Sequence, residues 1–154
     1  MLLTNHTLTG VALGLIIDQP AVLLPAAVAS HLAMDALPHF GFREELNKSS
    51  FRNPRFLLLG SADFALSLVV TAAACLAFPA RAGHILLGVF GADLPDLTYI
   101  PVIIFGRGRV ERWLPFYRPM LRFLARIQWF ERPIGLITEG IWATLMLIII
   151  NVVR

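Results

Sequence analysis

The hydrophobic positions of the chain gather into long runs that predict membrane-spanning helices. Three runs approach or exceed the roughly 20 apolar residues needed to cross a bilayer, and they cover residues 55–78, 84–105 and 133–153. The sequence Asp93-Leu94-Pro95-Asp96 interrupts the second run near its middle. Because a proline and two acids disfavour a continuous helix in lipid, we expect this span to be broken there.

Two shorter apolar runs precede the spans, at residues 11–17 and 21–36. Asp18-Gln19-Pro20 separates them, and this sequence is typical of a turn followed by a helix start. We therefore expect a hairpin of two short helices in place of one irregular span. Pro38 should stop the second helix near the preceding residue, because proline disfavours helical backbone before it.

The segment 106–132 is basic, with seven arginines and two acids. Arg118, Arg122 and Arg126 recur every four residues, which places them on one helix face. Apolar residues cover much of the rest, so we expect an amphipathic helix at the membrane surface with its arginines toward anionic headgroups. This segment and the charged loop at 41–55 are separated by two spans, and the positive-inside rule puts both on the cytoplasmic side.

The predicted fold class is therefore all-α: a polytopic membrane bundle with an N-terminal helical hairpin, three spanning helices and one interfacial amphipathic helix. Composition agrees, because 57% of the 154 residues are hydrophobic and only 15% are charged, whereas a soluble domain is nearer half apolar and a quarter charged. The length suits one integral membrane domain over residues 1–154. A net charge of +3 does not suggest nucleic acid, and the bacterial inner membrane is the expected location.

Ionisable residues inside these apolar segments are the candidate chemistry, because charges within a bilayer are costly and persist mainly at functional sites. His31 and Asp35 are four residues apart, so both side chains leave one helix face and could bind one metal ion. Pro38 forces His39 off that helix, which lets it turn back over the site. Imidazole and carboxylate ligands favour zinc, with manganese or iron as alternatives.

Helix geometry brings further acids into the same layer. At about 1.5 Å of rise per residue, Asp63 and Glu139 lie roughly 12 Å below the cytoplasmic boundary, and Asp93 and Asp96 lie at comparable depth. If the first two helices form a hairpin, His6 also starts near that boundary. We expect Asp63, Glu139 or Asp96 to supply a catalytic base, or the first two to orient a histidine ligand.

Each of these features also has a purely structural explanation. A histidine within a membrane can simply form a hydrogen bond across helices. Asp93 and Asp96 could cap a helix start, and Asp63 and Glu139 could pair with buried arginines. The arginine face of 118–126 could do no more than contact lipid headgroups.

The order of the polar residues resembles that of two known families. His6, then His31-x-x-x-Asp35-x-x-Pro38-His39, then Asp93-Leu94-Pro95-Asp96 is similar to the inner-membrane metal-dependent hydrolases known as LexA-binding membrane hydrolases. The early histidine and the His-x-x-x-Asp pair also resemble the all-helical zinc-dependent phospholipases C. Carried over residue by residue, the resemblance implies metal ligands at His6, His31, Asp35, His39, Asp93 and Asp96.

The expected function is a membrane-embedded metal-dependent hydrolase that cleaves a lipid phosphoester near the cytoplasmic interface. A metal ion would activate a water molecule, and Arg132 or the arginines of 118–126 would hold the phosphate. Membrane lipid is the expected partner, and a homo-oligomer is left open. Two rival functions also stay open: a small transporter or proton-coupled carrier, since broken helices and midplane carboxylates fit that class, and a non-catalytic membrane assembly protein.

Overall fold

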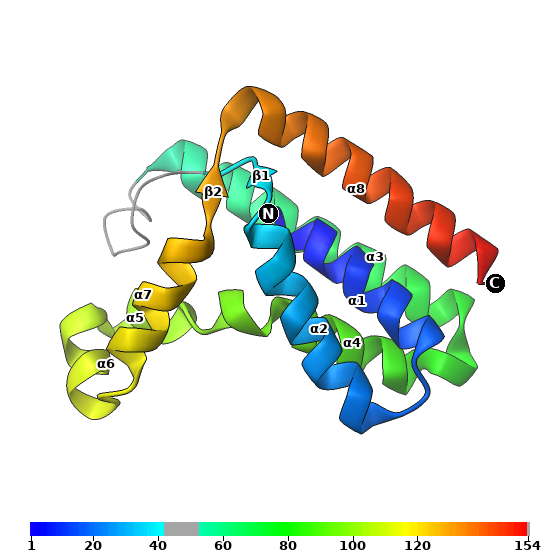
Figure 1. Cartoon of the computed structure of the whole chain (residues 1–154), viewed down its shortest axis with the longest axis horizontal. Helices are drawn as coiled ribbons and strands as arrows, with labels where there is room; N and C mark the ends of the chain where they lie inside the picture. The colour runs from blue at the N-terminus through cyan, green and yellow to red at the C-terminus, as the bar shows by residue number, and fades with distance from the viewer. Residues whose placement is uncertain (42–52, 154) are drawn as a thin grey trace.

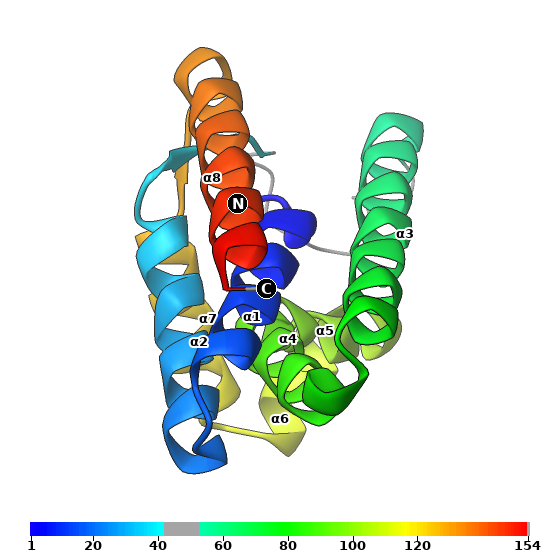
Figure 2. The ribbon, with the colours of Figure 1, turned by 90° about the vertical axis from the view of Figure 1, so that its right-hand side faces the viewer.

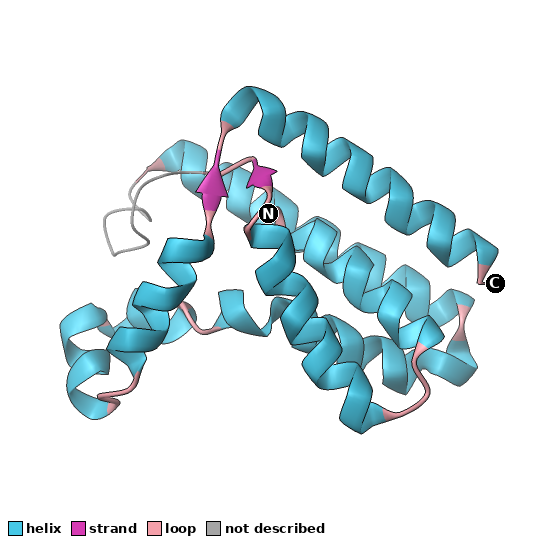
Figure 3. Ribbon diagram, viewed as in Figure 1, coloured by secondary structure: helices cyan, strands magenta, loops and turns pink. Residues whose placement is uncertain are grey.

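Helices joined by short connections make up the chain in the computed structural model, which describes residues 1–41 and 53–153 (Figure 1, Figure 3). Most of the loop predicted at 41–55 lies outside the described residues. The helices are α1 (Leu3–Ile16), α2 (Pro20–Asp35), α3 (Pro54–Ala77), α4 (Ala82–Leu97), α5 (Ile100–Phe105), α6 (Arg107–Trp113), α7 (Tyr117–Ile127) and α8 (Arg132–Val152). A single 3-10 turn, η2 (Pro79–Arg81), and two short strands, β1 (Pro38–His39) and β2 (Trp129–Phe130), complete the described elements. The predicted all-α fold class is confirmed.

Three segments are long and apolar enough to cross a membrane: Pro54–Ala77, Pro79–Val102 and Pro133–Val152. Only 6% of the most apolar part of the first span and 17% of that of the third are buried inside the protein. Their large apolar side chains therefore face outward, as in Leu76, which is 82% exposed. Such surfaces need lipid around them, and the prediction of a multi-pass membrane protein agrees with them.

The predicted N-terminal hairpin is also present, because α1 and α2 are separate helices joined by Ile17–Gln19. Arg81 donates hydrogen bonds to the Asp18 carboxylate and to the Leu15 carbonyl oxygen, which fastens this turn to the connection between α3 and α4. The hydrogen bond from Arg81 lowers the pKa of Asp18. His84 contacts the Asp18 carbonyl oxygen at the same end of the bundle.

Helix α1 lies at the centre of the bundle, where it packs against α4, α3, α8 and α2 (Figure 2). Every residue from Asn5 to Ala12 is buried. Two glycines of α1 allow its backbone to approach α4 closely. A Cβ atom added at Gly10 would lie 2.6 Å from the Val89 Cα atom, and one added at Gly14 would lie 2.6 Å from the His84 carbonyl oxygen. Small residues at these positions let the two helix backbones pack closely.

Adding a methyl group at Gly10 is therefore expected to destabilise the protein. We expect Gly10→Ala to lower stability by about 1–3 kcal/mol, the usual cost of overpacking a core, measured as a lower thermal midpoint in detergent. The matched control is Gly60→Ala in α3, where an added Cβ meets nothing within 4 Å. There the substitution should be neutral or stabilising, since alanine favours helix over glycine. Equal effects at the two sites would contradict the packing described.

The break predicted at Asp93–Asp96 is wrong in position. Helix α4 continues through Pro95 to Leu97, and the chain turns at Thr98 and Tyr99 before α5 begins. A proline inside a helix removes one backbone hydrogen bond and pushes nearby carbonyl groups outward without having to end the helix. Both acids therefore stay on one helix that faces α1 and α2.

Helices α5, α6 and α7 form an arm beside the bundle, on the side where α8 begins (Figure 1). Buried Val102, Val110, Tyr117 and Leu121 form a small core of their own within it. The amphipathic helix predicted around 118–126 is confirmed as α7. From α7 the chain enters β2, which pairs in parallel with β1 and so returns to the end of α2.

Candidate metal centre

Three helices each supply one side chain to a buried cluster, which we call the metal cluster: His6 of α1, His31 of α2 and Asp96 of α4. One ligand atom from each lies within 4.8 Å of the other two. The two imidazoles are stacked, with ring centroids 3.8 Å apart and an angle of 16° between their planes. The sequence predicted all three as ligands, and the structure brings them together in a group that could hold a metal ion.

The Asp35 carboxylate contacts one nitrogen of each stacked imidazole. Its Oδ1 atom is 3.3 Å from the Nε2 atom of His6, and its Oδ2 atom is 3.3 Å from the Nε2 atom of His31. Oδ1 is also 3.9 Å from the Nε2 atom of His39. The side chain of Asp35 is only 5% exposed, so this carboxylate has almost no water to stabilise its charge and depends on cationic or hydrogen-bonding neighbours.

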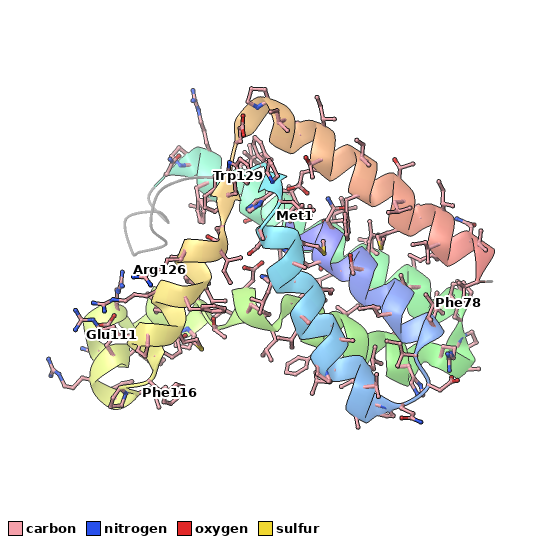
Figure 4. All side chains as sticks on the ribbon, viewed as in Figure 1. Met1, Phe78, Glu111, Phe116, Arg126 and Trp129 are labelled. Carbon is pink, nitrogen blue, oxygen red and sulfur yellow. The ribbon has the colours of Figure 1, made fainter. Side chains whose placement is uncertain are left out.

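Two further groups contact Asp35, and the sequence gave no indication of either. The amino group of Met1 lies 2.5 Å from Oδ1, and Gln128 donates a hydrogen bond of 3.3 Å to Oδ2 from the segment that joins α7 to β2. Figure 4 shows Met1 beside the carboxyl end of α2. Long-range contacts of this kind leave no periodic pattern in a sequence.

Backbone carbonyl groups fix which ring nitrogen of His31 and of His39 faces the carboxylates. The Nδ1 atom of His31 lies 2.6 Å from the Ala92 carbonyl oxygen, and that of His39 lies 2.8 Å from the Leu37 carbonyl oxygen. A carbonyl oxygen can only accept, so Nδ1 carries the proton and the Nε2 atom of a neutral ring presents a lone pair. In both residues that lone pair points toward Asp35, an arrangement that repels unless a cation or a proton lies between.

Buried imidazole nitrogens that lack a hydrogen-bond partner among the described residues also fit a cation beside Asp35. Both ring nitrogens of His6 and the Nε2 atom of His39 are buried with no hydrogen-bond partner among the described residues. Burial lowers the pKa of His39, which favours the neutral imidazole that binds metal ions. Buried polar atoms are nearly always satisfied in native proteins, so three such atoms beside two carboxylates fit a metal ion well.

His39 reaches the cluster through the strand pair, which the sequence analysis did not predict. Pro38 aligns with Trp129 and His39 with Phe130 in parallel register, and the Glu131 backbone N–H donates to the His39 carbonyl oxygen over 3.0 Å. Two-residue strands are too short to produce an alternating pattern, so nothing in the sequence marked them. The predicted return of His39 toward the cluster after Pro38 agrees with its 3.9 Å distance from Asp35.

Asp63 and Glu139 lie beside the start of α1. Asp63 accepts hydrogen bonds from the backbone N–H groups of Leu3, over 2.7 Å, and Thr4, over 3.0 Å. Glu139 accepts from the Leu2 N–H over 3.0 Å and from the Asn5 side chain. Free N–H groups and the helix dipole make a helix start favourable for carboxylates. Both acids therefore anchor the helix that carries His6.

The other predicted site residues, Asp93, Arg132 and the arginines of α7, lie on three different helices. Asp93 accepts a hydrogen bond of 3.1 Å from the hydroxyl group of Thr7, the residue directly after His6 on α1, and is not part of the three-residue metal cluster. Arg132 begins α8, and its side chain lies outside the described residues. The three arginines of α7 are exposed on the arm.

Comparisons with family models, with curated proteins and with solved structures find no match to this chain. The structure shows a helical protein that has, among its described residues, three apolar helices of spanning length and a buried His-His-Asp group able to hold a metal ion.

Proposed function

We propose that this chain is a membrane-embedded metal-dependent hydrolase of the bacterial inner membrane that cleaves a lipid phosphoester at the cytoplasmic interface. Zinc is the favoured ion. One observation carries the proposal: ligand atoms of His6, His31 and Asp96 converge within 4.8 Å from three helices, while Asp35 contacts both imidazoles. Two imidazoles with carboxylates are a common donor set for hydrolytic zinc.

Such an ion would supply an activated water molecule at neutral pH. The chain contributes orientation, because the Ala92 carbonyl group fixes the ring of His31 and the Leu37 carbonyl group fixes that of His39. A hydrogen-bonded partner of this kind holds an imidazole in the tautomer that binds metal. Asp35 is the buried counter-charge that would offset part of the charge of the ion.

Asp96 is the member of the cluster that substrate would meet. Its side chain is 32% exposed, whereas those of His6 and His31 are at most 1% exposed. We infer that the reacting group approaches from the side of Asp96, which would either bind the ion or accept a proton from water. The spanning helices expose large apolar side chains, a surface that suits approach of a lipid substrate from within the bilayer.

The activity test uses purified full-length protein in detergent, with phosphatidylglycerol and phosphatidylethanolamine as substrates and phosphorylated headgroup release as the readout. We expect zinc-dependent release that chelation abolishes. Asp96→Asn, which keeps the side-chain shape, should lower the rate by about 100-fold or more, the usual loss when a catalytic carboxylate is neutralised.

The matched control is Asp18→Asn, because Asp18 is exposed in the turn that links α1 to α2. This variant should keep the wild-type rate. The proposal fails if purified protein holds no stoichiometric metal and no phosphoester tested is cleaved. Ion flux into liposomes without metal dependence would favour the transporter function in its place.

A further inference from the structure

One face of α7 is built into the arm and the opposite face is open. Tyr117 and Leu121 are each 5% exposed and pack with Val102 and Val110. Leu124 is buried one turn further on, 8% exposed. This packing fixes the rotation of the helix about its axis, so the residues on the outer face are held outward.

The outer face of α7 carries three arginines, Arg118, Arg122 and Arg126, which are all exposed. Four-residue steps place them about 6 Å apart along one side of the helix. The sequence of α7 contains no acidic residue, and none of the three guanidinium groups forms an ion pair with another described residue. The exposed face therefore holds three charges that no described residue compensates; we call it the arginine face.

Chain topology puts this face at the membrane surface. The arm connects the span that ends at Val102 with the span that begins at Pro133, so both of its ends lie on one side of the bilayer. Exposed aromatic residues accompany the arginines: Trp113 is 59%, Phe116 63% and Phe123 55% exposed. Figure 4 shows Phe116 and Arg126 at the outside of the arm. Aromatic rings beside basic residues are typical of segments that lie among lipid headgroups.

We propose that the arginine face is a binding site for the headgroups of anionic phospholipids. This site is separate from the metal cluster and does not depend on hydrolase activity. Guanidinium groups donate paired hydrogen bonds to phosphate oxygens, and the negative charge of the lipid complements three cations that have no described partner. Phe123 precedes Arg126 by three residues, so the two occupy neighbouring positions on the helix surface, and the exposed ring of Phe123 would enter the acyl boundary.

The test measures lipid preference on the full-length protein in mixed micelles. Brominated phosphatidylglycerol and brominated phosphatidylcholine are compared as quenchers of tryptophan fluorescence, because Trp113 and Trp129 lie in or next to the arm. Each basic residue near an anionic surface contributes about fivefold in affinity. We therefore expect wild-type protein to prefer phosphatidylglycerol at least tenfold, and the preference to fade in high salt because the charges are screened.

Two variants isolate the arginine face. R118Q/R122Q/R126Q should lose most of the preference, whereas R118K/R122K/R126K should keep much of it because the charge is retained. Arg55→Gln, at the exposed start of α3, is the control for loss of a cation elsewhere. Equal quenching by the two lipids in wild-type protein, or an unchanged preference in the glutamine variant, would overturn the proposal. If the glutamine variant does not fold, the salt dependence of the wild-type preference decides between the outcomes.

Discussion

If the metal cluster holds an ion as proposed, replacing His31 with alanine is expected to abolish metal binding by the purified protein. The variant loses the Nε2 atom that lies 3.3 Å from Asp35 and 3.8 Å from Asp96. Disturbing a partner of a ligand typically costs 10–100-fold in metal affinity, so deleting the ligand itself should cost at least about 100-fold. Elemental analysis gives the stoichiometry, and competition with a chromophoric chelator gives the affinity.

His84→Ala is the matched control for this experiment. His84 contacts the Asp18 carbonyl oxygen in the turn region at the opposite end of α1, so its loss removes an imidazole without touching the metal cluster. The control should keep wild-type zinc content. The metal centre would be refuted if thermal melting shows that the His31→Ala protein is folded and this protein still binds zinc as tightly as wild type does.

Replacing Asp63 with alanine is expected to destabilise the whole bundle. The carboxylate accepts from two backbone N–H groups and from the Thr4 hydroxyl group, with Oδ1 2.5 Å from the Thr4 Oγ1 atom. Loss of hydrogen bonds to a charged group costs about 1.5–3 kcal/mol, and the uncapped helix start adds to it. We expect a decrease of about 2–4 kcal/mol, with a weaker metal affinity as a consequence because His6 is one turn away.

Comparison of three variants separates anchoring from catalysis. Asp63→Asn keeps an acceptor for the N–H groups and should lose less stability than Asp63→Ala. Asp18→Ala removes an acid whose side chain is 80% exposed in its pair with Arg81, and exposed pairs contribute little to stability, so its effect should be much smaller than that of Asp63→Ala. If Asp63→Ala instead kept its thermal midpoint and metal content but lost turnover, Asp63 would be a catalytic base.

The sequence predicted those features that depend on residues close together in the chain. The i, i+4 spacing placed His31 and Asp35 together, the apolar runs defined the spans, and the turn at Asp18-Gln19-Pro20 separated α1 from α2. In each case the relevant interaction lies within a few residues, and helix geometry alone fixes it.

The remaining features depend on contacts between distant segments. The four-residue spacing rules cannot reveal that Gln128 reaches Asp35 or that Asp63 caps α1, since 93 and 60 residues separate the members of these pairs. Pro95 misled the prediction because a helix whose bundle holds it in place tolerates an interior proline. The depth argument grouped the acids by their distance from the cytoplasmic boundary, but such a distance does not distinguish Asp96, which lies 3.8 Å from an imidazole of the cluster, from Asp63, which lies beside the start of α1.

The central position of α1 has a consequence for biosynthesis. Asn5, His6, Thr7 and Thr9 are buried only because α2, α3, α4 and α8 surround them, and polar groups left in acyl chains are costly. The carboxylates that anchor the start of α1 come from Asp63 and Glu139, which the ribosome makes later. The helix that is synthesised first therefore lacks its full set of neighbours until α8, the last of them, has been made.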